Sequence, residues 1–236
     1  FVPVTRPGYS RRTPISAYRR QARGGKGLIG RTALDEDELE HLFVAGTLNT
    51  ILFFSDLGKV YATRTYEIPE FDRTAKGVSL MNVLPLSPEE KITAALPVHD
   101  FDEGEYLIMI TRKGRIKRVE LGVFANVRPS GLIAVNLEPG DSLGWVKMTR
   151  GEQDIILISQ QGKGIRFNEE EVRPMGRAAA GVNAMRLDSW DMLAGADVAT
   201  DDADLLVITQ KGFGKRTPLT EYRLSLIHIS EPTRPY

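Results

Sequence analysis

The sequence contains no cysteine, which excludes disulfide bonds and thiolate metal sites. Its three histidines, His41, His99 and His228, lie far apart and fit no metal-ligand spacing. No apolar run reaches the roughly 18 residues that a membrane-spanning helix needs, and the first residues lack the pattern of a secretory signal peptide. From these absences we expect a cytoplasmic protein without a metal site or a membrane contact.

A nucleotide-binding P-loop is also absent. The stretch QARGGKG, residues 21–27, combines three glycines with two positive charges and no carboxylate, and such segments can bring backbone amides close to a phosphate. A P-loop, however, requires G-x-x-x-x-G-K followed by Ser or Thr, whereas Gly27 follows Lys26 here. The phosphate that this stretch would bind is therefore not that of a P-loop nucleotide.

The formal net charge of zero conceals an uneven distribution. Residues 1–34 contain no acidic residue and eight basic ones: Arg6, Arg11, Arg12, Arg19, Arg20, Arg23, Lys26 and Arg31. The remaining residues carry 23 basic against 31 acidic side chains. This asymmetry predicts a surface that binds a polyanion.

A repeat runs through the chain, in which an apolar run leads to Ser or Thr, two variable residues and a glycine. The glycines of its five copies are Gly8, Gly58, Gly114, Gly162 and Gly212, at intervals of 50, 56, 48 and 50 residues. The hydroxyl residues stand three positions earlier, at Thr5, Ser55, Thr111, Ser159 and Thr209. Each copy is typical of a strand, a tight turn and a second strand, because the glycine permits a positive φ in the turn.

A second glycine follows the first after 17 to 19 residues, at Gly27, Gly77, Gly131 and Gly181. In the last three copies we expect it to open the third strand of its own copy, followed by another apolar segment. About four strands in every 50 residues predict an all-β fold of propeller-like blades, a β-pinwheel with about four complete four-stranded blades and a truncated fifth.

Basic residues keep fixed positions in this repeat. Four residues after the first glycine, four of the five copies carry arginine: Arg12, Arg118, Arg166 and Arg216. The preceding residue is also basic in three copies: Arg11, Lys117 and Lys215. The segment before the second glycine is basic too: Arg23, Lys26, Arg73, Lys76 and Arg177. A charge that recurs once per blade predicts a positive stripe around a rim, with a purely structural role beside the turns as the alternative.

Together these residues resemble the C-terminal domain of the DNA gyrase A subunit. QARGGKG is similar to the hallmark of that domain, the gyrase A box, usually Gln-Arg-Arg-Gly-Gly-Lys/Arg-Gly, and departs from it at Ala22. HLFVAGTLNTILFFSDLGKVY and LPLSPEEKITAALPV are similar to the second blade of that domain. The resemblance covers residues 1–223.

The resemblance implies a β-pinwheel of about six blades in the whole domain, which wraps duplex DNA around its rim without sequence preference. In the holoenzyme, with a second A subunit and the gyrase B subunit, the wrap would support ATP-dependent negative supercoiling. The holoenzyme would be a DNA topoisomerase, an isomerase, in the cytoplasm with the nucleoid. This chain would hold no catalytic residue and no cofactor, because the cleaving tyrosine and the sites for ATP and Mg belong to other regions.

The resemblance also assigns DNA-binding residues. The box would contribute Gln21, Arg23, Gly24, Gly25, Lys26 and Gly27. The rim would contribute Arg11, Arg12, Arg19, Arg20, Arg73, Lys76, Lys117, Arg118, Arg166, Arg177, Lys215 and Arg216.

Two alternatives remain open at this point. The corresponding domain of the topoisomerase IV A subunit shares the blades, but its box is typically degraded or missing, whereas Gly24-Gly25-Lys26-Gly27 is intact here. A protein-binding propeller of the WD-repeat type would explain Trp190-Asp191, although that dipeptide does not recur with the repeat.

The last thirteen residues, LSLIHISEPTRPY, break the repeat. They resemble the peptide obtained by translating a sequencing-library adapter. We therefore expect the blades to occupy residues 1–223 and residues 224–236 to form a tail that is foreign to the domain, with a natural divergent terminus as the alternative.

Overall fold

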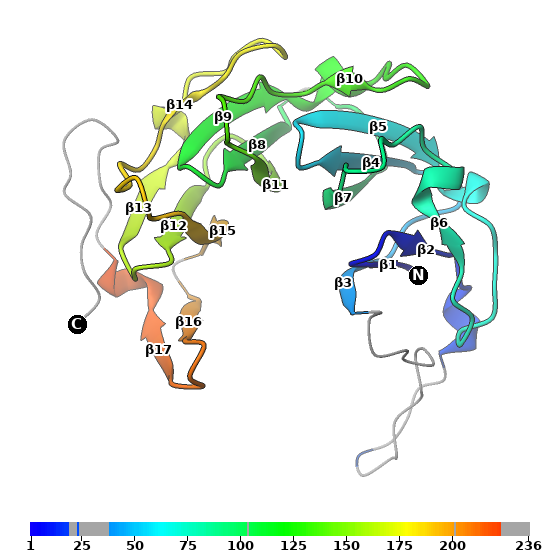
Figure 1. Cartoon of the computed structure of the whole chain (residues 1–236), viewed down its shortest axis with the longest axis horizontal. Coiled ribbons are helices and arrows are strands. Elements are labelled where there is room, and N and C mark those ends of the chain that lie inside the picture. The colour runs from blue at the N-terminus through cyan, green and yellow to red at the C-terminus, as the bar shows by residue number, and fades with distance from the viewer. Residues whose placement is uncertain (19–22, 24–37, 103, 201, 223–236) are drawn as a thin grey trace. The chain divides into compact units, whose positions relative to one another are not determined.

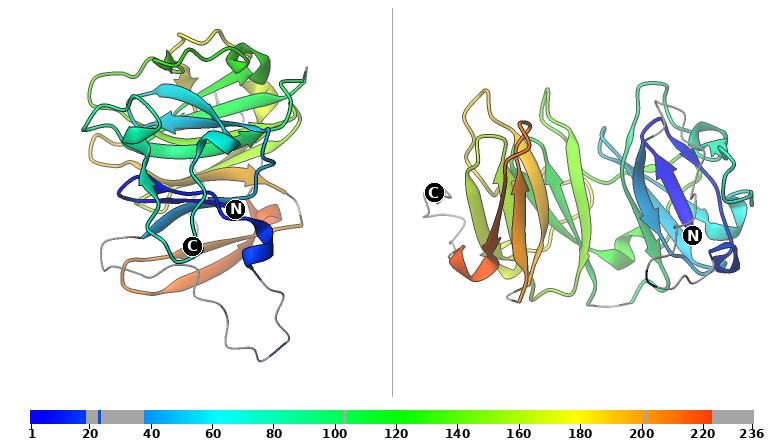
Figure 2. Two further views of the ribbon diagram at one scale, coloured as in Figure 1. Left: turned by 90° about the vertical axis from the view of Figure 1, so that its right-hand side faces the viewer. Right: turned by 90° about the horizontal axis from the view of Figure 1, so that it is seen from below.

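The computed structural model describes all residues except 19–22, 24–37, 103, 201 and 223–236 (Figure 1). The expected all-β, propeller-like architecture is confirmed, since the described strands form five antiparallel sheets, drawn from two further sides in Figure 2. Two compact units contain these sheets: residues 1–101 with 126–133, and residues 102–125 with 134–236. None of the helices among the described residues is long and apolar enough to span a membrane.

The first unit contains two four-stranded sheets. In spatial order, the first consists of β3 (Leu39–Phe43), β1 (Val2–Thr5), β2 (Tyr9–Ser10) and β6 (Val78–Ser79). The second consists of β10 (Leu132–Ile133), β5 (Lys59–Arg64), β4 (Thr50–Ser55) and β7 (Ile92–Val98). A hydrophobic core that includes Val4, Phe53 and Leu80 joins the two sheets.

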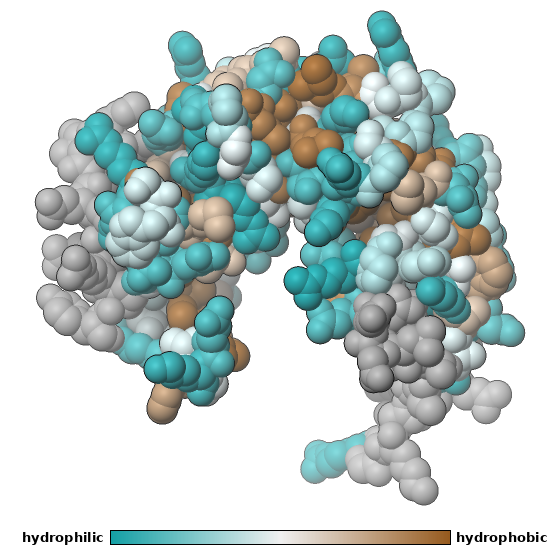
Figure 3. Space-filling model, viewed as in Figure 1, coloured by the Kyte–Doolittle hydropathy of each residue, from teal (hydrophilic) through white to brown (hydrophobic). Residues whose placement is uncertain are grey.

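The second unit contains sheets of four, three and two described strands. The four-stranded sheet consists of β11 (Leu143–Thr149), β8 (Tyr106–Thr111), β9 (Arg115–Glu120) and β14 (Val182–Asn183). The three-stranded sheet consists of β13 (Gly164–Asn168), β12 (Asp154–Ser159) and β15 (Leu193–Ala199). The two-stranded sheet is the hairpin of β16 (Asp204–Ile208) and β17 (Gly214–Pro218). One core, with Ile108, Leu157 and Phe167, joins the first two sheets. At the tip of the β16–β17 hairpin, hydrophobic residues lie among hydrophilic ones (Figure 3), and Phe213 is 74% exposed.

Six short 3₁₀ helices among the described residues follow or connect the strands. They are η1 (Ile15–Ala17), η2 (Thr65–Glu67), η3 (Leu80–Asn82), η4 (Leu121–Phe124), η5 (Glu169–Glu171) and η6 (Leu219–Glu221). Four of them, η2, η4, η5 and η6, begin directly after the second strand of a hairpin, so the helical turn recurs with the repeat.

The hydroxyl–glycine repeat forms the hairpin turns, as predicted. All five glycines have positive φ, between 75° at Gly58 and 83° at Gly114. In each turn the hydroxyl oxygen accepts a hydrogen bond from the amide of the residue after the glycine, at 3.1 Å for Thr5 and 3.2 Å for Ser159. The constant spacing within the repeat thus follows from a local side-chain-to-backbone bond that stabilises the turn.

The expectation that the second glycine opens the third strand of its own copy is wrong. The two residues after Gly77, Gly131 and Gly181 form β6, β10 and β14, and each strand pairs with the outer hairpin strand of the preceding copy. A Cβ atom on Gly77 or Gly181 would collide with a carbonyl oxygen of that neighbouring strand. Because the chain crosses to the preceding blade, three described sheets have four strands, whereas the sheet of β12 has three.

Gly181→Ala should lower the thermal midpoint of the chain, because the new Cβ would strain a backbone with φ of 81° and collide with the Ile116 carbonyl. We expect a loss of at least about 2 kcal/mol of stability. Gly176→Ala is the matched control, since no heavy atom lies within 4 Å of its added Cβ. Equal melting curves for the two variants, measured by circular dichroism, would contradict the crossing that this glycine permits.

Candidate nucleic-acid interface

The segments that cross to the preceding blade carry basic residues along the outer sheet edges. We call them arms: the β5–β6 arm is residues 68–77, the β9–β10 arm is residues 125–131, and the β13–β14 arm is residues 172–181. Each arm ends at a second glycine and is followed by a two-residue strand.

Backbone hydrogen bonds hold the β5–β6 arm against the end of β2. The Arg12 amide donates to the Pro69 carbonyl at 3.0 Å, and the Phe71 amide donates to the Arg12 carbonyl at 3.1 Å. The guanidinium of Arg12 also forms an ion pair with Glu70 at 3.2 Å. Further along the arm, the exposed Lys76 places its ammonium 4.0 Å from the centroid of the Tyr9 ring.

The β13–β14 arm lies on β9 in the same manner. The Met175 amide donates to the Arg118 carbonyl at 2.8 Å, which matches the contact between Phe71 and Arg12. Arg173 and Arg177 are exposed on this arm. Two equivalent arms thus present exposed cations at the outer edges of their blades.

A buried cation lies beneath each of these two arms. Arg11 is 2% exposed, and its guanidinium donates to the Arg73 carbonyl. Lys117 is 1% exposed, and its ammonium donates to the Arg177 carbonyl and, at 2.7 Å, to the Ala134 carbonyl. Burial and the neighbouring positive charge of Arg177 lower the pKa of Lys117 from 10.5 to about 8.

Two of the recurring arginines are also buried and have partners within the chain. Arg118 is 8% exposed and lies over the Tyr106 ring at 4.8 Å. Arg166 is 6% exposed and binds the Asp154 carboxylate through two nitrogens, at 2.9 and 2.6 Å. The exposed Arg216 repeats this ion pair with Asp204 at 3.2 Å.

The expectation of one exposed rim stripe is therefore wrong for Arg11, Lys117, Arg118 and Arg166, which support the blades from inside. Other rim positions reach the surface in whole or in part: Arg12, Arg73, Lys76, Arg177, Lys215 and Arg216. In the box, Arg23 is exposed. The other assigned positions lie outside the described residues: Arg19, Arg20, Gln21, Gly24, Gly25, Lys26 and Gly27.

Counting basic positions relative to the glycines did not identify Arg128 and Arg173, two exposed cations on the arms. Both stand in a Val-Arg-Pro tripeptide, at residues 127–129 and 172–174. The recurrence of that tripeptide was the available signal. It does not keep a constant distance from the second glycine, so counting from the glycine overlooked it.

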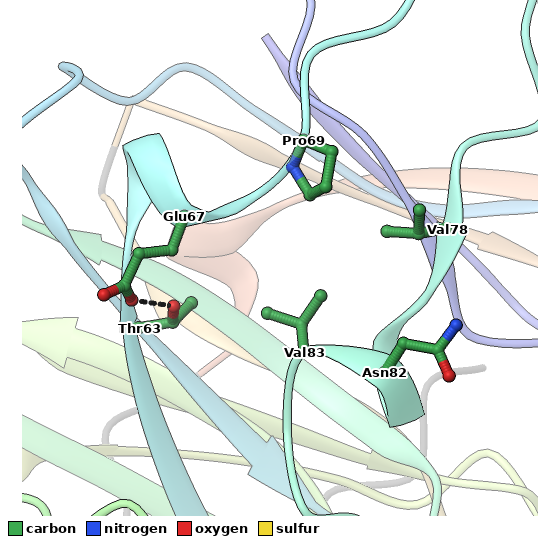
Figure 4. A pocket seen from close by; sticks show the side chains of 6 residues that line it. All are labelled: Thr63, Glu67, Pro69, Val78, Asn82 and Val83. Atoms are coloured by element: carbon green, nitrogen blue, oxygen red, sulfur yellow. Dashed lines mark hydrogen bonds between the residues drawn. The ribbon is translucent and has the colours of Figure 1, made fainter.

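A surface cavity of about 440 Å³ in the first unit does not suit an anion (Figure 4). Thr63, Glu67, Pro69, Val78, Asn82 and Val83 line it. The Glu67 carboxylate accepts hydrogen bonds from the Thr63 hydroxyl and the Arg64 amide, which lower the pKa of Glu67. The cavity borders the β5–β6 arm at Pro69, but its lining holds a carboxylate and no cation.

Comparison with known proteins shows which protein family the chain belongs to. The family model described as "DNA gyrase C-terminal domain, beta-propeller" matches residues 4–45, 49–99, 105–147, 153–200 and 203–225. The chain belongs to this family. The match follows the five copies of the repeat, and it decides against the WD-repeat alternative.

Relatives with high identity are gyrase A subunits. The chain is 50% identical over 222 residues to the DNA gyrase A subunit of Clostridium acetobutylicum, covering 94% of this chain and 27% of that protein. Among solved structures, a C-terminal domain of DNA topoisomerase IV superposes with a TM-score of 0.81 at 30% identity, covering 95% of this chain and 68% of that one. A DNA gyrase A C-terminal domain superposes with a TM-score of 0.72 at 25% identity, covering 95% and 73%. The chain spans about a quarter of the length of the curated relatives it matches.

The lowered pKa of Lys117 predicts a pH-dependent stability. Between pH about 8 and 10.5 the unfolded chain binds a proton at this lysine that the folded chain has released, so the free energy of unfolding rises with pH in this window. The melting temperature of the wild type minus that of Lys117→Met should therefore increase from pH 7.5 to 9.5. A difference that stays constant or falls, measured by calorimetry in matched buffers, would contradict the buried charge.

Proposed function

We propose that this chain binds duplex DNA through its basic arms and box, and forms the DNA-wrapping part of a gyrase A subunit. The observation that carries the proposal is that the β5–β6 and β13–β14 arms are each anchored to their blade in the same way, in a member of the gyrase C-terminal family. Each arm is fixed to the edge of its blade and presents exposed cations, Lys76 on one and Arg177 on the other.

The chemistry of these groups favours the phosphate backbone over base edges. Ammonium and guanidinium groups on an outer edge can approach phosphates along a duplex, and such contacts supply affinity without reading sequence. Binding is therefore proposed to be independent of sequence. Exposed carboxylates such as Glu70 beside Arg12 would limit the affinity of single contacts, so several arms must act together.

In the whole enzyme, the wrapped segment would be presented for strand passage with a fixed handedness. The proposed partners are a second A subunit and the gyrase B subunit, with ATP and Mg bound through regions outside this chain. The activity proposed for that assembly is ATP-dependent negative supercoiling by a topoisomerase in the bacterial cytoplasm. This chain would supply binding and geometry, and none of its side chains is assigned to catalysis.

A topoisomerase IV role is the second candidate, because the superposition on a topoisomerase IV C-terminal domain has a TM-score of 0.81. The box sequence at residues 21–27 and the 50% identity to a gyrase A subunit favour gyrase. The supercoiling experiment below separates the two candidates.

DNA affinity should fall steeply with salt, because counterions are released from the phosphates that the protein neutralises. If about five phosphates are engaged, the slope of log affinity against log salt is about −4 to −5. Fluorescence anisotropy with linear duplexes of different sequence measures this slope. Absent binding, or binding that is insensitive to salt, would refute the proposal.

Within an intact gyrase A subunit that carries this domain, Arg23→Ala with Lys26→Ala should abolish supercoiling and leave ATP-independent relaxation active. The reason is that wrapping sets the direction of strand passage, whereas cleavage occurs elsewhere. Lys113→Ala, which removes one exposed lysine from the β8–β9 turn, serves as a control for the loss of a surface charge. Undiminished supercoiling by the double variant would remove the box from the proposal.

A further inference from the structure

The two arms with a buried cation beneath them share a length that the third arm lacks. The first and second glycines of the copies that supply the β5–β6 and β13–β14 arms are 19 residues apart, Gly58 to Gly77 and Gly162 to Gly181. In the copy that supplies the β9–β10 arm the spacing is 17 residues, Gly114 to Gly131. The β9–β10 arm also carries Val127 where the long arms carry Arg73 and Arg177, four residues before the glycine.

The strand residue beneath each arm changes together with that length. It stands three residues after the first glycine of the preceding copy, and is Arg11 or Lys117 beneath a long arm but Tyr61 beneath the short one. The ring of Tyr61 lies against Gly131, and its hydroxyl donates to Glu90 at 2.9 Å instead of reaching the arm. The strand residue beneath the arm, the length of the arm and the residue four positions before its glycine therefore vary together.

Hydrogen bonding explains why a long arm needs a cation. The carbonyls of Arg73 and Arg177 accept hydrogen bonds from the buried side chains of Arg11 and Lys117. Without these acceptors the buried donors would be left unsatisfied, which is costly. A long cationic side chain reaches across the arm, and Lys117 also binds Ala134, at the start of the segment after β10. The donor thus fixes the backbone of an arginine whose side chain is exposed at Arg177 and partly exposed at Arg73.

We propose that Lys117, and Arg11 at the equivalent position, are positioning residues for DNA, which hold a long arm so that the arginine on it meets a phosphate. The inference rests on the proposed DNA binding. It adds two residues that never touch DNA, because they are 1% and 2% exposed. It also predicts that no contact of this buried-cation kind forms at Val127, the equivalent position of the short arm.

The test compares Lys117→Met, Arg177→Ala and the double variant in the whole chain. Removing one phosphate contact should reduce the magnitude of the salt slope by about 1, so each single variant should show that loss. The double variant should lose no more than Arg177→Ala alone, because both changes remove the same contact. Lys117→Arg should keep the full slope, since arginine performs this role at position 11.

Two controls separate positioning from general loss of stability or charge. Val119→Ala removes fully buried methyl groups from the same strand and should lower the melting temperature without changing the slope. Lys113→Met removes an exposed charge from the β8–β9 turn. A full slope for Lys117→Met, or additive losses in the double variant, would overturn the proposal.

Hydrogen exchange in the absence of DNA provides a readout that does not depend on the proposed function. Amides of residues 173–180 should exchange at least tenfold faster in Lys117→Met than in wild type or Val119→Ala. Unchanged exchange would show that Lys117 does not hold the arm, even if the chain binds DNA. Faster exchange in a chain that binds no DNA would instead refute the proposed function, while confirming that Lys117 holds the arm. Should Lys117→Met fail to fold, Arg11→Met with exchange at residues 69–76 makes the same test.

Discussion

In the three described blades that contain β6, β10 and β14, the outer edge depends on one contact, the packing of a glycine backbone against the neighbouring strand. At Gly77 and Gly181 the neighbour is a carbonyl oxygen, so a Cβ atom at either position would collide with it. The close approach lets the following two residues pair with the edge strand, which satisfies backbone groups that would otherwise remain exposed. It also forces the preceding residues of the arm to lie across the end of that strand. Buried donors beneath the arm and charged side chains above it both follow from this geometry.

Local chemistry made the hairpins predictable from sequence. The hydroxyl of Ser55 or Ser159 and the glycine three residues later act on their own turn, so their pattern predicts structure without knowledge of the rest of the chain. The partner of the next strand was not predictable in this way. A two-residue strand such as β6 has no pattern that distinguishes its own blade from the preceding one, and only the close packing at Gly77 makes the choice.

The recurring cations illustrate a different limit. Neighbouring strand residues such as Lys117 and Arg118 point to opposite faces, and both were predicted from the sequence to lie at the rim. Both are buried, because one face packs within the unit and the arm covers the other. The repeat located the recurring basic positions. It could not distinguish a buried cation that binds a carbonyl from a cation that is exposed to solvent. A cation is buried or exposed depending on whether a distant segment covers it. The arm that covers Lys117 contains Arg177, 60 residues further along the chain.

The electrostatics of the arms agree with the proposed binding of a polyanion. A buried ammonium beneath an exposed guanidinium is unfavourable in the free protein, and the lowered pKa of Lys117 reflects both its burial and the repulsion by Arg177. Carbonyl oxygens offset part of that cost from within the fold. A phosphate beside the arm would offset more, because its negative charge attracts both cations at once. Where the chain replaces the buried cation by Tyr61, the arginine of the arm is replaced as well, by Val127. The two positions thus change together, as expected if the proposed phosphate contact needs both.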